Sequence, residues 1–327
     1  MLTVITGASG HVGINLIENL KARNRKVRAV THKNNSVLAG LGIELVAADV
    51  LDPDSLMRAF KGADVVYHLA AHISILMNEW EQCCKLNIEG TQNVILACRK
   101  VGVKRLVHFS SIHALSQHPL DVVLDESRNF VKSTGCPPYD HSKAEAEKIV
   151  RQAIDNGMNA IIINPTGILG PNDYQPSLFG EALINMATGK YPVLVSGGFD
   201  WVDVRDVVEG AIRAEQQSQA GAAYLLSGHY VSVRDMAKMA AGILGKRATQ
   251  LICPMGPARL CAPVVTVVAR MTGQRPLFTT ASLKALICNK HISHARATRD
   301  LGYNPRPMGV TLKDTLTWFK EHGYLRT

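Results

Sequence analysis

Short hydrophobic runs alternate with amphipathic segments over the first 165 residues of the chain. The runs are rich in Val, Ile and Leu, as expected of strands that are buried on both faces of a sheet. They predict strands over 2–6, 26–31, 43–48, 64–70, 104–110 and 159–164. Between these runs apolar residues recur every three or four positions, which predicts helices over 11–23, 52–60 and 87–102. The alternation indicates a parallel sheet with helices on both faces, a doubly wound α/β (Rossmann) fold.

The pattern changes after Pro165. The segment 170–177, GPNDYQPS, has the composition of a loop, and the elements beyond it are shorter and less regular. They are predicted as a helix over 178–188, a strand over 193–195, a helix over 201–215 and a strand over 222–228. The remainder is predicted to be mostly helical and is interrupted by six prolines.

These patterns predict two domains of unequal size. Residues 1–170 form the larger, doubly wound (Rossmann) domain, to which 193–228 contributes a strand and a helix. Residues 171–192 and 229–327 form a smaller, mostly helical substrate-binding domain. That domain would close over the carboxyl edge of the sheet, where open α/β folds bind their ligands.

The composition is that of an ordinary soluble globular protein, with 46% hydrophobic and 19% charged residues in 327. The N-terminus enters an apolar strand directly, so no signal peptide is expected. Seven cysteines, an odd number without CxxC spacing, favour free thiols in a reducing compartment. A cytoplasmic location is therefore expected.

The net charge of +9 is concentrated near the C-terminus, because residues 246–327 hold 13 basic and 3 acidic side chains. Within that part, 260–269 (LCAPVVTVVA) is apolar but too short to span a bilayer. A basic, partly apolar lobe could contact an anionic membrane or attract an anionic substrate. We favour a third interpretation, a core-facing helix beneath a solvated basic surface.

Two other classes of partner receive no support from the sequence. No basic patch with interleaved aromatic residues is present, so no nucleic acid is predicted to bind. His291 and His294 have HxxH spacing, but no further ligand lies near them in the sequence. Such a pair is more often a surface feature than a metal site, and no metal is predicted.

A glycine-rich segment, TGASGHVG (6–13), follows the first predicted strand and opens the first predicted helix. Gly7 permits a tight turn, Gly10 lets the backbone approach a phosphate, and Gly13 lets the helix pack near the sheet. The N-terminus of the helix offers unpaired N–H groups to a pyrophosphate. The segment therefore predicts a dinucleotide site, to which Ser9, His11 and Val12 also contribute.

The choice of dinucleotide depends on the end of the second strand. An NAD site places an acidic residue there for the ribose hydroxyls, whereas a 2′-phosphate needs cations. Thr31 stands where the acid would be, and His32 and Lys33 follow it. We therefore expect NADP(H), with NAD(H) as the other candidate. Asp49 follows the third strand, where its carboxylate can accept a bond from the adenine amino group.

The segment YDHSK places Tyr139 four residues before Lys143 at the start of a predicted helix. A phenol with a pKa near 10 is a poor acid–base group at neutral pH unless a cation lowers that pKa. The ammonium of Lys143 lies on the same helical face and can favour the phenolate. Ser110 and Ser111, at the end of the fifth strand, are candidate donors to a substrate oxygen.

These motifs occur in the order seen in extended short-chain dehydrogenases/reductases, and the chain resembles that family nearly from end to end. It is most similar to the dihydroflavonol 4-reductase-like group, also called the NAD-dependent epimerase/dehydratase family. The resemblance rests on TGxxGxxG at 6–13, Asp49-Val50, HLAA at 68–71, Asn87, SS at 110–111, YxxxK at 139–143 and NPTGILGP at 164–171.

The resemblance implies roles for individual residues. It makes Tyr139 the acid–base residue and Lys143 its partner, which also holds the ribose of the cofactor. Ser111 matches the substrate-oxygen donor better than Ser110 does, and Asn87 is implied as a supporting catalytic residue. Further cofactor contacts are implied for Val50, Leu69, Ala70, Ala71, Pro165, Thr166 and Gly167. A homodimer is implied by analogy with the family alone.

The substrate side of the site carries fewer signals. Nucleotide-sugar enzymes of this family usually have an arginine where this chain has Phe199, and an aromatic residue there suits a less charged substrate. Asn164 favours a nucleotide-sugar substrate instead, because it matches a substrate-contacting asparagine of some epimerases. His72 and His113 are candidates for the substrate pocket.

The sequence therefore predicts an NADPH-dependent reductase of a small-molecule ketone or aldehyde. Two alternatives stay open, because the triad does not distinguish them. One is a sugar or nucleotide-sugar epimerase that retains its cofactor. The other is a non-catalytic, cofactor-binding regulator.

Overall fold

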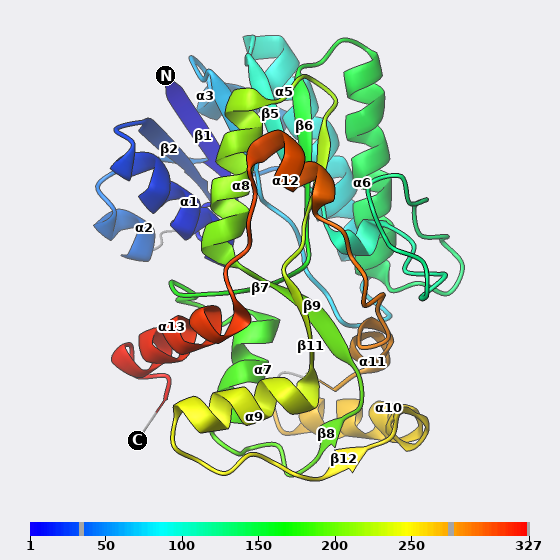
Figure 1. The fold of residues 1–327 in the computed structure, drawn as a ribbon. Helices are drawn as coiled ribbons and strands as arrows, with labels where there is room; N and C mark the ends of the chain where they lie inside the picture. Colours follow the sequence, from blue (N-terminus) through cyan, green and yellow to red (C-terminus); the bar gives the residue numbers. More distant parts are fainter. Residues whose placement is uncertain (33–35, 274–277, 326–327) are drawn as a thin grey trace.

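A seven-stranded parallel sheet forms the larger lobe of the protein, seen in a computed structural model that describes residues 1–32, 36–273 and 278–325 (Figure 1). The strand order is β10-β6-β5-β4-β1-β2-β3, and every neighbouring pair is parallel. The strands are β1 (Leu2–Thr6), β2 (Lys26–Thr31), β3 (Glu44–Ala47), β4 (Val65–His68), β5 (Arg105–Phe109), β6 (Ala160–Pro165) and β10 (Ala223–Leu226). The doubly wound α/β prediction is confirmed.

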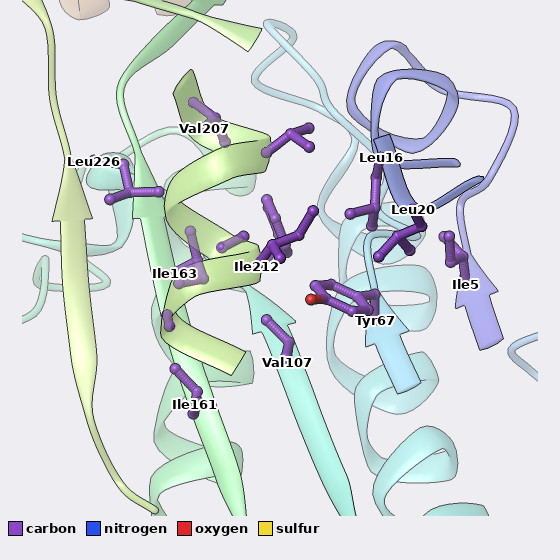
Figure 2. Close-up of a cluster of buried hydrophobic side chains, with 14 of the residues drawn as sticks. Ile5, Leu16, Leu20, Tyr67, Val107, Ile161, Ile163, Val207, Ile212 and Leu226 are labelled. Carbon is purple, nitrogen blue, oxygen red and sulfur yellow. The ribbon is translucent and has the colours of Figure 1, made fainter. Parts of the chain in front are cut away.

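Helices cover both faces of this sheet. One face carries α1 (His11–Ala22), α2 (Ser36–Gly40), α8 (Val204–Gln217) and α12 (Ala295–Leu301), and the other carries α3 (Pro53–Phe60), α5 (Gly90–Val101) and α6 (Pro138–Asp155). Figure 2 shows Tyr67 and Val107 of the sheet beside Ile212 of α8 and Leu20 of α1. The intervening residues of the same strands, such as Val66, pack against the opposite helices. Burial on both faces explains why the strands read as continuous apolar runs.

The smaller lobe contains two short sheets and five helices among its described residues. Strand β9 (Gly198–Asp203) lies between β7 (Gly167–Leu169) and β11 (His229–Ser232), and β8 (Leu194–Val195) pairs with β12 (Ile252–Cys253). The helices are α7 (Leu178–Ala187), α9 (Val233–Ile243), α10 (Met255–Met271), α11 (Thr280–Ala285) and α13 (Met308–Glu321). Both α8 and β10, from the segment 193–228, belong to the larger lobe, whereas β8 and β9 from the same segment belong to the smaller one.

The helix predicted over 201–215 is wrong in its first three residues. Trp201, Val202 and Asp203 end strand β9, which pairs with β7 and β11, and α8 begins at Val204. The side chain of Asp203 accepts a hydrogen bond from the backbone N–H of Arg205 and so caps the helix. Alternation of buried aromatic and polar residues up to this cap was the signal of a strand.

Helix α10 contradicts the interpretation of 260–269 as a core-facing segment. Leu260, Val264, Val267 and Val268 are all more than half exposed, because the helix turns other residues inward. None of the helices within the described ranges is both long and apolar enough to cross a membrane.

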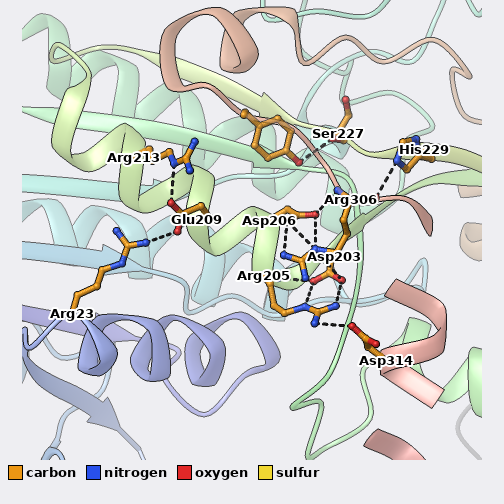
Figure 3. A network of polar contacts seen from close by, with 11 residues as sticks. Arg23, Asp203, Arg205, Asp206, Glu209, Arg213, Ser227, His229, Arg306 and Asp314 are labelled. Atoms are coloured by element: carbon orange, nitrogen blue, oxygen red, sulfur yellow. Dashed lines mark hydrogen bonds and ion pairs between the residues drawn. The ribbon is translucent and has the colours of Figure 1, made fainter. Parts of the chain in front are cut away.

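An ion-pair network fixes the C-terminal chain against α8 (Figure 3). Arg306 donates to both carboxylate oxygens of Asp206, at 2.7 to 3.1 Å, and lies 3.6 Å from Asp203. Arg205 donates to Asp203 and also pairs with Asp314 of α13 at 2.8 Å. Burial raises the pKa of Asp203, but its bonds with Arg205 outweigh burial and lower that pKa overall. The segment WVDVRD thus joins the two lobes.

We expect the Arg306→Leu substitution to lower the free energy of unfolding by about 2 kcal/mol, because it removes the guanidinium that donates to Asp206 and lies beside the buried Asp203, which keeps its pair with Arg205. The matched control is Arg299→Leu, which removes an exposed pair with Asp300 and should lower the free energy of unfolding far less. Urea unfolding measures both losses. Equal losses in the two variants would show that the network does not stabilise the fold.

Candidate active site

The strand order of the large sheet reverses between β1 and β4, and the site lies at the carboxyl ends of the strands around this point. Chains leaving neighbouring parallel strands on opposite sides of such a reversal create a crevice. The glycine loop follows β1, residues 69–72 follow β4, and Ser110 and Ser111 follow β5. The first turn of α6 supplies Tyr139.

The surroundings constrain the three glycines of the loop after β1 in different ways. Gly7 has a φ of +69°, and an added Cβ would lie 2.6 Å from the backbone nitrogen of Ala70. At Gly13 an added Cβ would lie 2.6 Å from the carbonyl oxygens of Gly7 and Ala8. Both glycines are therefore required by close contacts within the fold.

Gly10 differs, because a Cβ there would meet only the carbonyl oxygen of Gly7, at 3.3 Å, and would otherwise point into open space. Gly10 and Ser9 are exposed, and among the described residues no side chain caps α1 at this end. The N–H groups of the first turn are thus open to a ligand, as a pyrophosphate requires. The residues present fit a dinucleotide, whose phosphates would lie over Gly10, His11 and Val12.

Of the residues predicted around the loop, His11 has an additional structural contact. Its Nε2 lies 2.9 Å from the carbonyl oxygen of Pro171, and Asn15 donates to the same oxygen. Leu69 and Ala70 run directly over Gly7, and Ala71 follows them toward the crevice. These contacts place the chain after β4 beside the phosphate loop.

At the end of β2, Thr31 is half-buried and the side chain of His32 is 69% exposed, with its Nδ1 3.6 Å from the carboxylate of Asp49. Lys33 lies outside the described residues. Asp49 also accepts a bond from the backbone N–H of Leu51. Val50 contacts the small Gly90 of α5, which brings this turn against the helix.

Tyr139 lies in the first turn of α6, beside Ser111. Burial raises the pKa of Tyr139 to about 12, while a hydrogen bond with Ser111 acts in the opposite direction. Asp140 and the neighbouring Cys83 raise this pKa further. Burial dominates the pKa of Tyr139 in this structure and keeps the phenol neutral, and the lowering expected from Lys143 stays a prediction.

Lys143 is buried and donates to the carbonyl oxygen of Phe109 at 2.6 Å. Burial lowers the pKa of its ammonium to about 8, although the carboxylate of Glu147 acts to raise it. The ammonium is thus held at the end of β5, one residue before Ser110. Ser110 itself is buried, and its Oγ has no hydrogen-bond partner within the described part of the chain.

Asn87 does not reach the crevice directly but ties together the elements that line it. Its side chain accepts from the backbone N–H of His72 at 2.7 Å and donates to the carbonyl of His72 at 3.0 Å. It also donates to Ser142 Oγ at 2.8 Å, and Ser142 donates to the carbonyl oxygen of Tyr139. Asn87 is therefore a positioning residue. It lies in a π-helical segment (Cys84–Glu89), a form often found at functional sites.

The two candidate substrate histidines occupy different surroundings. His113 lies edge-on to the ring of Tyr139, and its Nδ1 is 3.6 Å from Asp140. Burial lowers the pKa of His113, but the Asp140 carboxylate more than offsets this and raises it overall. His72 points to Glu79, with 2.9 Å between Nε2 and Oε2. His113 is thus the histidine beside Tyr139.

Asn164 and the loop after β6 lie behind the crevice. Asn164 is 2% exposed and donates to Glu147 and to the carbonyl of Ser111, so its side chain is not presented to a substrate. Thr166 donates to the buried Asp200 at 2.7 Å. The neighbouring Pro165 ends β6, and Gly167 begins β7.

Phe199 belongs to a cluster of three aromatic rings. Its centroid lies 5.0 Å from that of Phe179 and 5.2 Å from that of Trp201. A Cβ on Gly167 would lie 3.4 Å from the ring of Phe179, so the cluster adjoins the loop expected to face the nicotinamide. Trp201 is buried in the core of the smaller lobe, whereas Phe179 and Phe199 pack against that core and are partly exposed.

Two residues important to this geometry escaped sequence analysis. Ser142 links Asn87 to Tyr139, and Glu147 holds Asn164 and acts on Lys143. Both lie on the inner face of α6 with Lys143, and both are fully buried. The sequence did contain a signal for Glu147, because a residue four positions after Lys143 shares its helical face.

A model of the NAD dependent epimerase/dehydratase family matches residues 3–227 of this chain. The chain belongs to this family. It is 31% identical to "Sterol demethylase protein B" of Methylococcus capsulatus, over 99% of this chain and 100% of that protein. It is 28% identical to "Putative dihydroflavonol 4-reductase" of Synechocystis sp., over 99% and 96% of the two chains. The resemblance to extended short-chain dehydrogenases/reductases is confirmed.

Comparison of structures agrees with this assignment. The crystal structure of gox2253 superposes with a TM-score of 0.87 at 31% identity and covers 99% of both chains. Solved nucleotide-sugar epimerases, at 22% identity or less, share the fold alone. The protein is an NAD(P)-dependent oxidoreductase of this family, as the sequence predicted.

The ammonium of Lys143 gives the site a testable pH dependence. Because the pKa of Lys143 is lowered to about 8, the ammonium is present below that pH and is lost above it. We expect the turnover rate to fall above about pH 8, while Tyr139 stays protonated throughout. In Lys143→Arg, whose guanidinium does not titrate, this alkaline limb should vanish although the rate is lower. Persistence of the limb in that variant would assign it to another group.

Proposed function

We propose that the protein is an NADPH-dependent reductase of a ketone or aldehyde with an apolar body. The observation that carries this proposal is the aromatic cluster of Phe179, Phe199 and Trp201 beside Gly167. A nucleotide diphosphate needs a guanidinium or similar donor at this place, and an aromatic wall supplies none. Transfer of a hydrophobic carbonyl compound from water into such a site costs less desolvation free energy than transfer of a nucleotide diphosphate.

The protonation state of Tyr139 supports a role for it as a proton donor. A phenol whose pKa is raised to about 12 is protonated at neutral pH and can donate to a carbonyl oxygen. Ser111 would hold the same oxygen from the end of β5. A bound nicotinamide supplies the hydride. After transfer, the phenolate of Tyr139 would be stabilised by the Lys143 ammonium on the same helical face.

The names of relatives support an apolar carbonyl substrate. One relative, 28% identical over 94% of this chain, is named "2-alkyl-3-oxoalkanoate reductase" in Stenotrophomonas maltophilia. Another is named "3beta-hydroxysteroid-dehydrogenase/decarboxylase isoform 1" in Arabidopsis thaliana. Both names describe an alcohol or ketone on a largely hydrocarbon body, and this is the substrate class we propose here.

A nucleotide-sugar epimerase is the alternative, and the basic surplus after residue 245 favours it. Asn164 adds little to that case because its side chain is engaged by Glu147 and Ser111. A non-catalytic regulator is a third candidate, but such a protein would need neither Ser111 nor Tyr139.

Reaction stoichiometry distinguishes these functions. We expect the protein to oxidise NADPH in step with carbonyl loss from a panel of alkyl ketones, aldehydes and steroid ketones. Tyr139→Phe should lower turnover by at least about a thousandfold, because the proton donor is lost, and leave NADPH binding within about twofold. Interconversion of sugar nucleotides without net absorbance change would instead indicate the epimerase. Full activity of Tyr139→Phe would remove this residue from the mechanism.

We also propose that NADPH is preferred to NADH, since His32 follows Thr31 where an acid would bind the ribose. NADPH should bind about tenfold tighter than NADH, measured by fluorescence titration. Thr31→Asp should reverse this order, because a carboxylate accepts from a ribose hydroxyl and repels a 2′-phosphate. Binding of NADH tenfold tighter than NADPH by the unmodified protein would overturn the proposal.

A further inference from the structure

Helix α10 is packed in the reverse of the usual surface orientation. Its small residues face inward: Ala258 and Ala262 are buried and pack with Leu283. Five large apolar residues face outward and are between 52% and 82% exposed, namely Leu260, Val264, Val267, Val268 and Met271. Surface helices of soluble proteins normally bury the large apolar residues and expose the polar ones.

The spacing along α10 produces this orientation. Residues 258, 262, 266 and 269, which are Ala, Ala, Thr and Ala, repeat at helical intervals and form the inward face. Residues 260, 264, 267, 268 and 271 repeat in the same way on the outward face. A contiguous apolar stripe of this size marks an interaction surface rather than scattered exposure.

Basic residues accompany the exposed stripe. Residues 236–299 contain ten Lys and Arg and no Asp or Glu. Arg259 is exposed next to Leu260, and Lys246 and Arg247 are exposed in the loop between α9 and β12. This loop runs along the same edge of the smaller lobe as β12 and α10 (Figure 1). Leu251 of the loop is also 65% exposed.

We propose that the outward face of α10, together with the loop 244–251, docks on the surface of an anionic lipid bilayer. The apolar side chains would enter the boundary between headgroups and acyl chains, and the cations would contact the lipid phosphates. A second copy of the chain fits this face less well. A two-fold contact would place the same cations opposite each other, with no acid in 236–299 to pair with them.

The docking surface is connected to the loops around the candidate active site. Thr279, just before α11, donates to the carbonyl of Ile75 at 2.6 Å, and Lys284 of α11 donates to the carbonyl of Gly135 at 2.7 Å. The first loop follows β4, and the second leads into α6 and Tyr139. Ile73 and Met77 of the first loop are themselves exposed. Docking through α10 would therefore hold these loops close to the lipid surface.

Sedimentation with vesicles tests this proposal without any substrate, so its outcome is separate from that of the reductase assay. We expect the full-length protein to sediment at low salt with phosphatidylcholine vesicles that contain roughly 30% phosphatidylglycerol, and much less with phosphatidylcholine alone. The triple variant Leu260→Gln, Val264→Gln and Val268→Gln should bind at least about tenfold more weakly. The triple variant Lys246→Gln, Arg247→Gln and Arg259→Gln should also lose about tenfold.

Matched controls separate docking from general effects on charge or folding. Leu96→Gln with Val310→Gln changes exposed apolar residues of α5 and α13. Lys26→Gln, Lys61→Gln and Lys100→Gln removes the same charge from the larger lobe. Both controls should bind within about twofold of the unmodified protein, and thermal unfolding should confirm that all variants fold.

Three results would overturn the proposal. The first is no sedimentation of the unmodified protein with anionic vesicles at low salt. The second is unchanged binding by the α10 triple variant. The third is a dimer of the unmodified protein, measured by light scattering, that the α10 variant converts to monomers, because a second copy would then cover this face.

Discussion

The geometry of the site depends on one buried amide, that of Asn87. Its hydrogen bonds hold the backbone of His72, after β4, against Ser142, which in turn bonds the carbonyl of Tyr139. A single side chain thus links the chain after β4, which lies over Gly7, to the helix that carries Tyr139. A buried polar network of this kind has few alternative arrangements, since any other would leave amide groups unpaired.

Burial also sets the chemistry of the two residues that Asn87 helps to place. It raises the pKa of Tyr139 to about 12 and lowers that of Lys143 to about 8. Burial disfavours the charged form of each group, so the phenol stays protonated while the ammonium stands near its titration point.

The smaller lobe carries two separate groups of apolar side chains. Its inner side carries the aromatic rings of Phe179 and Phe199 beside Gly167, and its outer side carries the apolar stripe of α10. The network of Arg306 with Asp206 anchors this lobe to the sheet through α8. The apolar substrate and the membrane-docking surface are independent proposals. In the first the lobe would contact the hydrocarbon body of a substrate, and in the second the acyl chains of a bilayer.

The sequence by itself determined the parallel sheet, the phosphate loop and the pair of Tyr139 and Lys143. Strand and helix periods, the need for glycine at Gly7 and the i, i+4 spacing are local properties, so they can be read along the chain. Tertiary structure alone decided that Trp201 lies in a strand, that Asn164 faces Glu147, and that α10 turns most of its valines outward. Each of these depends on a partner distant in sequence: the pairing with β7, the inner face of α6, and the surface that receives Ala258 and Ala262. The pKa of Tyr139 belongs with them, because desolvation is a property of the packed molecule.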